Sequence, residues 1–287
     1  MVPTPNPPDF EEAVRAHLEP VRTQFNYEQM LHTFLSVERF RAWAGVVDRY
    51  RPVAGARFLS SGCGYAGSLL AYRDAGAIQV TGVEVDPQYV RFGRLRVREL
   101  PDAAVLHTDG GRLPFPDRSF DVIESMDVIE HTEDPGAYLR ELTRLLSDDG
   151  VILVVTPNRL WPVEQHLHIV GPPWLPVGVG DRLFGGLSRL PRLSEERAFR
   201  YAELEGMRTR NVSMRRLRAL ARRHRLFLQV PPASTFGDGW PIPHQAAWIE
   251  RLAAHRYGCL AAPVRTLVAV LGHDHRRGVS SVARDTA

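Results

Sequence analysis

The feature that most constrains the fold is a regular alternation of short apolar segments with amphipathic ones in the first half of the chain. Apolar runs of strand length alternate with segments whose apolar residues recur every three or four positions. This spacing is typical of a doubly wound parallel α/β sheet with right-handed crossovers. All strand carboxyl ends then open onto one edge, where ligands bind. The predicted strands are 57–61, 80–85, 104–107, 120–125 and 151–156, and the predicted helices are 66–75, 87–100 and 135–146.

The segments on either side extend this unit. Residues 10–50 have helical periodicity and predict an N-terminal helical cap, whereas residues 1–8 hold four prolines and are expected to be a frayed leader. Beyond Asn158 the alternation stops, and 159–206 is too long for a simple connection. A helix 213–224 capped by Ser213, a strand 226–230, a helix around 244–256 and a strand 266–271 complete the prediction. The predicted divisions are a cap (1–50), a core (51–158), a lid insertion (159–206), the rest of the sheet domain (207–275) and a flexible tail (276–287).

Composition excludes several function classes. With 44% hydrophobic and 24% charged residues the chain is an ordinary globular one, and no apolar run is long enough to span a bilayer. Two cysteines far apart and no secretory h-region predict a reducing, cytoplasmic location. The net charge of +3 gives no argument for a nucleic-acid partner. All 36 cationic residues are arginines, which rules out lysine Schiff-base chemistry and the lysine of a P-loop.

A glycine-rich string marks the expected ligand site. Gly62-Cys63-Gly64-Tyr65-Ala66-Gly67 lies between the first strand and its helix, where glycines let a ligand approach the backbone and the helix N-terminus offers free N–H groups. Glu84, followed by Val85, ends the second strand, where a carboxylate can accept two hydrogen bonds from a ribose diol. These features fit a nicotinamide dinucleotide and any other adenosine-containing cofactor equally well.

The segments after the third strand distinguish the two. Asp109-Gly110 is followed by Leu113-Pro114-Phe115-Pro116-Asp117-Arg118-Ser119-Phe120-Asp121-Val122-Ile123, then by Val128-Ile129-Glu130-His131-Thr132-Glu133-Asp134-Pro135, a Leu-Arg-Glu-Leu helix and Thr156-Pro157-Asn158. As a set, residues 55–158 resemble class I S-adenosylmethionine-dependent methyltransferases of the ubiquinone/menaquinone-biosynthesis type. The resemblance implies a Rossmann-like fold. Together with the segments predicted above, the expected fold is a doubly wound, mostly parallel seven-stranded sheet with an N-terminal helical cap and a lid insertion after strand five.

The resemblance also assigns the cofactor-binding residues. It places Gly62 and Gly64 against the methionyl and ribose parts of S-adenosylmethionine, Glu84 on the ribose hydroxyls and Asp109 on the adenine, with Ser125 and Met126 facing the sulfonium. The full candidate set is Ser60, Gly62, Cys63, Gly64, Glu84, Val85, Asp109, Gly110, Ser125 and Met126.

Two residues depart from the family pattern. Ser60 stands where these methyltransferases usually have an acid that helps hold the cofactor's amino group, and Ala66 stands where they usually have glycine. Losing a charge-assisted contact costs about 1.5–3 kcal/mol, so we expect weaker cofactor binding. A non-catalytic, cofactor-binding partner subunit therefore stays open as an alternative.

Histidines are the candidate catalytic bases, because their pKa lies near neutral pH. His131 follows the fourth strand, and Glu164, His166 and His168 follow the fifth, where an extended chain projects all three to one side. The last three suit an acid/base cluster facing the acceptor, a metal site or a solvated loop, and no resident metal is predicted. The sequence has no serine elbow, H-E-x-x-H or C-x-x-C motif.

The acceptor is expected to be small or lipid-like. The lid segment is rich in large apolar residues, which would be costly if exposed beside a cofactor edge; they are Trp161, Trp174, Leu175, Val177, Leu183, Phe184 and Leu187. The arginines in 215–225 are interpreted as a solvated face, with an anionic acceptor or RNA as the second reading. We therefore predict a methyltransferase acting at oxygen. The alternatives are an NAD-type oxidoreductase and the partner subunit, and peripheral membrane contact and oligomeric state stay open.

Overall fold

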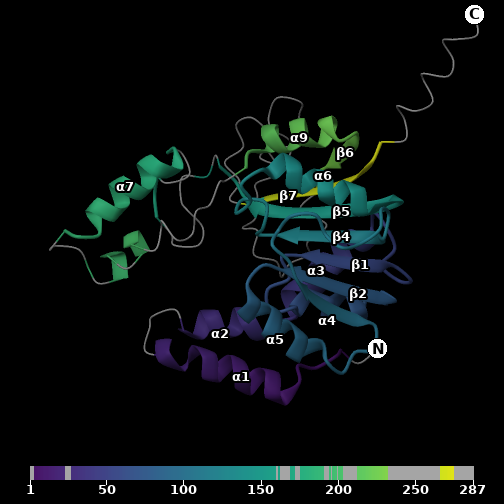
Figure 1. Cartoon of the computed structure of the whole chain (residues 1–287), viewed down its shortest axis with the longest axis horizontal. Coiled ribbons are helices and arrows are strands. Elements are labelled where there is room, and N and C mark those ends of the chain that lie inside the picture. Colours follow the sequence, from purple (N-terminus) through teal and green to yellow (C-terminus); the bar gives the residue numbers. More distant parts are fainter. Residues whose placement is uncertain are drawn as a thin grey trace, which may run out of the picture.

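The computed structural model describes residues 3–22, 27–159, 161, 169–171, 175–190, 194, 196–198, 200–202, 212–231 and 266–274 of the chain. Within them, seven strands form one sheet in the order β3-β2-β1-β4-β5-β7-β6 (Figure 1). β7 is antiparallel to both of its neighbours, and the pairs among β1 to β5 are parallel. The predicted seven-stranded, mostly parallel sheet is confirmed. The strands are β1 Arg57–Ser61, β2 Gln79–Glu84, β3 Ala103–His107, β4 Phe120–Met126, β5 Leu146–Pro157, β6 Leu226–Gln229 and β7 Thr266–His273.

Local sequence signals explain where several helices begin. Asp86 and Asp134 are N-caps whose carboxylates accept from the backbone two residues later, and each is followed by a proline at the first helical position. Ser213 caps the last helix by accepting from the Arg216 amide. The helices are α1 Pro8–Leu18, α2 Tyr27–Leu35, α3 Glu38–Asp48, α4 Gly67–Asp74, α5 Pro87–Val97, α6 Pro135–Leu145, α7 Val177–Leu187 and α9 Met214–Arg223, with a 3-10 turn at Glu19–Val21.

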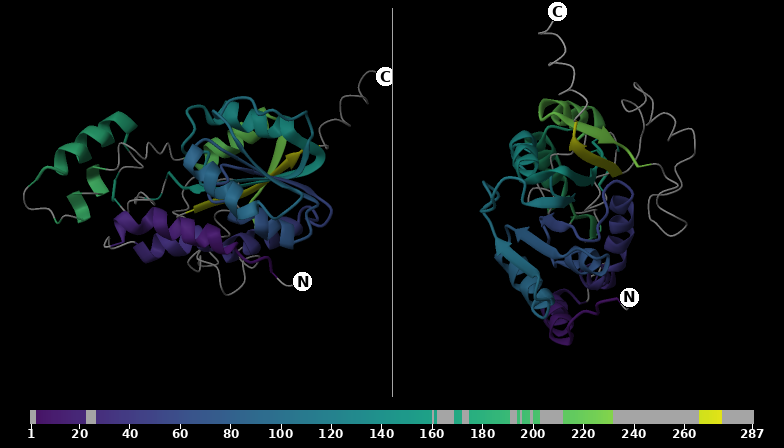
Figure 2. Two further views of the ribbon diagram at one scale, coloured as in Figure 1. Left: turned by 60° about the horizontal axis from the view of Figure 1, so that its bottom comes forward. Right: turned by 90° about the vertical axis from the view of Figure 1, so that its right-hand side faces the viewer.

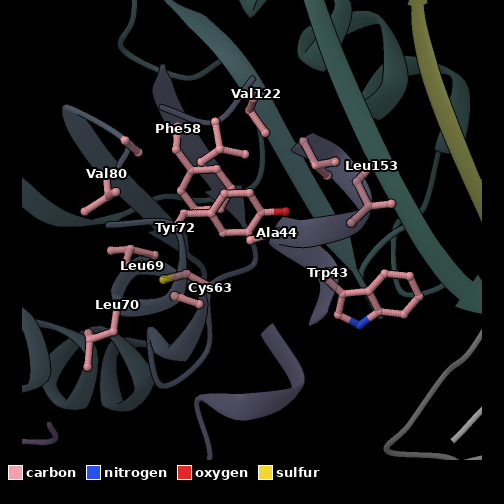
Figure 3. Close-up of a cluster of buried hydrophobic side chains, with 14 of the residues drawn as sticks. Trp43, Ala44, Phe58, Cys63, Leu69, Leu70, Tyr72, Val80, Val122 and Leu153 are labelled. Carbon is pink, nitrogen blue, oxygen red and sulfur yellow. The ribbon is translucent and has the colours of Figure 1, made fainter. Parts of the chain in front are cut away.

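The sheet is the middle of three layers because successive residues of a strand point to opposite faces. Phe58 and Val122 pack with α3, α4 and α5, in the cluster shown in Figure 3. Their neighbours Leu59 and Ile123 pack with α6 and α9 on the other face. The strands are therefore buried on both faces, as a parallel sheet with helices on each side requires.

The N-terminal segment is tied down, which corrects the expectation of a frayed leader. Thr4 donates to the Asp74 carboxylate through its amide at 3.0 Å and its hydroxyl at 2.6 Å, and Asn6 donates to the Leu35 carbonyl at 2.9 Å. Of the other predictions, β5 begins at Leu146 rather than at residue 151, with an irregular register against β4. The helix expected around 244–256 and the tail 276–287 lie outside the described residues.

Helix α7 represents the predicted lid segment. It lies apart from the sheet (Figures 1 and 2). The antiparallel strand β7 points away from it, so α7 is on the side where the parallel strands end. Phe184 and Ile169 are buried against each other, whereas Val170, Val179, Leu183 and Leu190 are about half exposed or more. In the parts of the chain that the structure describes, no helix has the length and apolar character needed to cross a membrane.

Candidate functional site

The strand order reverses at β1, which pairs with β2 on one side and β4 on the other. Ligands of open α/β sheets bind at the carboxyl ends of the strands flanking such a switch point. The loops after β1, β2, β3 and β4 meet at this edge, and with them the predicted residues Gly62, Gly64, Glu84, Asp109 and Met126. The topology therefore brings the predicted cofactor residues together.

The glycine loop after β1 is hydrogen-bonded to β2, and the space beside one of its glycines is free of other atoms. The amides of Gly62 and Cys63 both donate to the Val83 carbonyl, at 2.9 and 3.0 Å. Gly62 and Gly64 have φ values of +74° and +50°, in the region that favours glycine. A side chain at Gly62 would collide with Val128, but one at Gly64 would point into open space. Gly64 is thus the position where a ligand can lie directly on the backbone.

Glu84 joins this loop to the start of α5. Its buried carboxylate accepts from the amide of Gly64 at 2.8 Å through Oε2, and from those of Val85 and Asp86 at 2.8 and 3.2 Å through Oε1. A carboxylate offers about four acceptor positions, so three are already used. A ribose diol that donates two hydrogen bonds to Glu84 must therefore share or displace one of the three backbone amides. The Gly64 amide is the candidate, because the space beside Gly64 is open.

The loop after β3 supplies an apolar surface and a carboxylate. Val85 is 56% exposed, and a Cβ built on Gly110 would lie 3.7 Å from its Cγ1. Asp109 is exposed, with Oδ1 accepting from the Gly111 amide at 2.9 Å. An exposed valine beside an acidic side chain is the combination that an adenine ring with its amino group can use.

The remaining predicted cofactor residues differ in how they face the edge. Ser125 is fully buried, and its Oγ lies 2.9 Å from the Tyr138 hydroxyl, which also lies 2.9 Å from Ser61 Oγ. Ser125 therefore faces α6, whereas Met126 is partly exposed at the end of β4. Cys63 is buried against Gly82, and burial together with the charge of Glu84 raises the pKa of its thiol. Cys63 is a packing residue at neutral pH.

Two charged residues at this edge were not predicted. Glu124 on β4 is 1% exposed, and burial raises the pKa of its carboxyl to about 8, opposed by the charge of Arg39 and the Ser68 hydroxyl. Arg39, in the first turn of α3, places Nη2 3.6 Å from Met126 Sδ. A charged residue directly after the apolar pair Val122-Ile123 was the available sequence signal for Glu124. Nothing in the sequence placed Arg39 here, because α3 reaches the site only through tertiary packing.

Arg96 fastens the helical cap to the glycine loop. Its guanidinium, 2% exposed, donates to Asn6 Oδ1, to the carbonyls of Phe34 and Leu35 at the end of α2, and to the carbonyl of Tyr65. Tyr65 stacks on Phe34 with ring centroids 4.1 Å apart. The cap and the loop are therefore a single packed unit.

A second network explains why two parts of the sequence motif occur together. Glu141 on α6 accepts from the Leu113 amide, and Arg144 donates to the carbonyls of Leu113 and Phe115 and to Asp117. The Leu-Arg-Glu-Leu helix thus holds the Leu-Pro-Phe-Pro loop beside the edge.

The predicted catalytic residues are only partly described. His131 is exposed in the turn after β4, and its amide donates to the Val128 carbonyl at 2.9 Å. Glu164, His166 and His168 lie outside the described residues. Among those described, no group of three or more His, Cys, Asp or Glu side chains is arranged to hold a metal ion. A surface hollow of about 500 Å³ is bordered by residues 3–6, α2 and the start of α3, and none of the predicted site residues lines it.

The comparisons with known proteins match the segment of the chain that contains most of these residues. The family model described as "Methyltransferase domain" matches residues 59–154. A Mycobacterium tuberculosis protein named Probable S-adenosylmethionine-dependent methyltransferase is 37% identical over 124 residues, covering 42% of this chain and 43% of that protein. The ubiquinone biosynthesis O-methyltransferase of Xanthomonas oryzae is 35% identical over 136 residues, covering 43% of this chain and 52% of that protein. The chain thus spans about half or less of the length of these relatives.

Solved structures share the fold. The S-adenosylmethionine-dependent methyltransferase of Mesorhizobium loti has a TM-score of 0.53 at 14% identity, covering 82% of this chain and 99% of that one. The [4+2]-cyclase SpnF has a TM-score of 0.50 at 19% identity, covering 81% of this chain and 80% of that one. At such identities the likeness concerns the fold alone. The sequence matches show that residues 59–154 of this chain are similar to the methyltransferase domain of S-adenosylmethionine-dependent enzymes.

Proposed function

We propose that the protein transfers a methyl group from S-adenosylmethionine to an oxygen atom of a small or lipid-like acceptor. The observation that carries this proposal is the meeting of Gly64, Glu84 and Asp109 at the β1–β4 switch point, inside the matched domain. A glycine loop beside two carboxylates from successive strands suits an adenosine with an extended tail.

The residues present fit this cofactor. Glu84 would accept from the ribose hydroxyls, Asp109 and exposed Val85 would hold the adenine, and the open backbone at Gly64 would lie along the sugar and tail. Arg39, whose buried Nε has no hydrogen-bond partner among the described residues, would bind the tail carboxylate. When bound, the cofactor supplies a methyl group on a positively charged sulfur. The chain's task is then to position the acceptor in line and to take up its proton.

His131 is the proposed general base, because it lies in the turn at the carboxyl end of β4 and carries an imidazole, the side chain most often used to take up a proton in catalysis. Replacing His131 by Ala should lower kcat by roughly 10²–10⁴-fold and leave the Kd of S-adenosylhomocysteine unchanged. Glu164, His166 and His168 are the second candidates for this role. A His131→Ala enzyme with full kcat across pH 6 to 9 would transfer the assignment to them.

An apolar acceptor is supported by the surface of α7. Val179 and Leu183 lie one helical turn apart and are 52% and 48% exposed. A half-exposed apolar helix face on a monomer is typical of a surface that binds an apolar ligand or partner. Relatives named for ubiquinone biosynthesis and for 2-methyl-6-phytyl-1,4-hydroquinone methylation point in the same direction.

The deciding experiment uses the full chain. Incubating it with methyl-labelled S-adenosylmethionine and a cell extract, then identifying the labelled product by mass spectrometry, should give an O-methylated apolar molecule. Calorimetry should show binding of S-adenosylmethionine and S-adenosylhomocysteine. Absence of both binding and transfer would refute the proposal.

Two other functions have specific support. The glycine string and Glu84 also suit a nicotinamide dinucleotide, and tight binding of NADH measured by fluorescence would favour an oxidoreductase. Ser60 in place of an acid suits a partner subunit that binds the cofactor without using it. Labelled methyl transfer by the isolated protein would eliminate that reading.

A further inference from the structure

A buried polar cluster of Ser60, Ser68 and Glu124 lies near the carboxyl ends of β1 and β4. Ser60 and Glu124 are register partners across the β1–β4 pair, so both side chains point to the face covered by α3 and α4. Ser68, in the first turn of α4, donates from Oγ to Ser60 Oγ at 3.1 Å. Both strands end within two residues of this pair, next to the glycine loop and Met126.

Glu124 lacks the partners that its burial demands. It is 1% exposed, and neither carboxyl oxygen has a partner with hydrogen-bond geometry among the described residues. The nearby Ser68 hydroxyl lowers the pKa of this carboxyl, but it donates to Ser60. A buried acid without a partner is costly, whereas one that meets a cation is stabilised. The charged or titratable groups that interact electrostatically with Glu124 are Arg39 from α3, Tyr72 from α4, Asp127 after β4 and Cys63 in the glycine loop.

Arg39 does not satisfy this carboxyl directly. Its charge acts on Glu124, yet no ion pair joins the two in the described part of the structure, and the Arg39 Nε is itself buried without a partner. A carboxyl without a hydrogen-bond partner and a guanidinium whose Nε has none lie at one edge of the sheet. Together they are complementary to the two ends of an α-amino acid. S-adenosylmethionine and its demethylated product carry such a group on the sulfur.

We propose that Glu124 binds the α-ammonium group of the cofactor's amino-acid tail, supplying from β4 the carboxylate that Ser60 does not supply from β1. This assignment rests on the proposed function. It makes Glu124 a cofactor-binding residue, and it explains why a buried acid is retained beside a serine in the middle of the sheet.

The test compares two ligands that differ in the tail. S-adenosylhomocysteine carries the amino acid, and 5′-methylthioadenosine keeps the adenosine and the sulfur but lacks it. Calorimetry on the full chain should show that Glu124→Gln weakens S-adenosylhomocysteine by about 10- to 100-fold, the range of one charge-assisted hydrogen bond. The Kd of 5′-methylthioadenosine should stay within about twofold, because that ligand cannot reach Glu124.

Asp121→Asn is the matched control, since it exchanges a carboxylate for an amide at the other end of the same strand. It should lower the melting temperature and leave the ratio of the two Kd values unchanged. A Glu124→Gln protein that loses both ligands equally, or neither, would overturn the assignment. If the wild-type protein binds neither ligand, the proposed function fails first and the assignment fails with it. If it binds both and only the expected selectivity is missing, the assignment fails alone.

Discussion

At the scale of single residues, two glycines on opposite ends of β1 offer a matched comparison. Gly55 precedes the strand with φ +78° and Gly64 follows it with φ +50°, and in both a Cβ would meet no atom within 4 Å. An L-residue in this region costs roughly 1–2 kcal/mol. The two positions therefore share their conformational demand, and only Gly64 lies at the proposed site.

Gly64→Ala and Gly55→Ala should lower the free energy of unfolding by similar amounts, roughly 1–2 kcal/mol each. Gly64→Ala should also weaken S-adenosylhomocysteine by about tenfold or more, because its methyl group fills space that the ligand needs. Urea unfolding and calorimetry measure the two effects. Equal ligand affinity in both variants would show that the ligand does not lie on the Gly64 backbone.

Glu124 should also leave its signature on the pH dependence of stability. Because burial raises the pKa of its carboxyl to about 8, the folded protein keeps a proton that the unfolded chain has already lost above its ordinary pKa, near 4.5. Stability from this group is therefore highest below pH 4.5 and falls as the pH rises towards 8, by up to about 1.4 kcal/mol per pH unit. Glu124→Gln should flatten urea-unfolding stability over this window, whereas parallel curves for the two proteins would contradict the raised pKa.

At the scale of elements, the start of the β1–β4 pair depends on one carboxylate. Asp121 accepts three bonds of 3.0 Å from Arg57, from its amide, Nε and Nη2. Although burial opposes it, hydrogen bonding to the Arg57 side chain and amide lowers the pKa of Asp121 to about 2. Because the pKa of Asp121 is lower in the folded protein than in the unfolded chain, this carboxylate stabilises the fold above its unfolded pKa. The stabilisation is lost as the pH falls towards 2.

Asp121→Asn should therefore cost about 1.5–3 kcal/mol at neutral pH and remove part of the acid sensitivity between pH 4 and pH 2. The control is Asp148→Asn, which breaks the exposed ion pair with Arg118 and should change stability by about 0.5 kcal/mol or less. Chemical unfolding between pH 2 and 7 measures both. Equal losses in the two variants would mean that the partial burial of Asp121 and its three bonds to Arg57 add nothing.

Local signals made the elements of the core predictable, and tertiary contacts made others unpredictable. The helices predicted from Pro87 and Pro135 begin at those residues, and the short apolar segments located β1 and β4. The first residues of β5 were missed because Ser147 to Gly150 is a polar, turn-like sequence that nevertheless joins the strand. The glycine loop, Glu84 and Asp109 were predictable because each lies at or just after the end of a successive strand in the sequence. Arg39 reaches this edge only through the packing of α3, which no local pattern contains, and the partner of Glu124 on β1 depends on strand order.

At the scale of the whole molecule, a buried arginine ties the helical cap to the glycine loop. Arg96 on α5 reaches α2, the N-terminal segment and Tyr65 of the glycine loop with four donated bonds of 2.8 to 3.0 Å. Its neighbour Arg98 also bridges to the cap, by an ion pair with Asp9, but is 49% exposed. The two residues connect the same layers, one buried and one at the surface.

Arg96→Met should lower the free energy of unfolding by about 3 kcal/mol or more, because it leaves several buried carbonyls without donors. Arg98→Met should cost about 1 kcal/mol or less, as exposed pairs do. Hydrogen exchange should rise in α1, α2 and the loop around Tyr65 in Arg96→Met alone, while α6 and β5 stay protected. Since α3 and Arg39 belong to the same cap, the variant should also bind S-adenosylhomocysteine more weakly than Arg98→Met does. Loss of protection spread evenly over the sheet would show instead that Arg96 stabilises the fold as a whole and does not specifically couple the cap to the site.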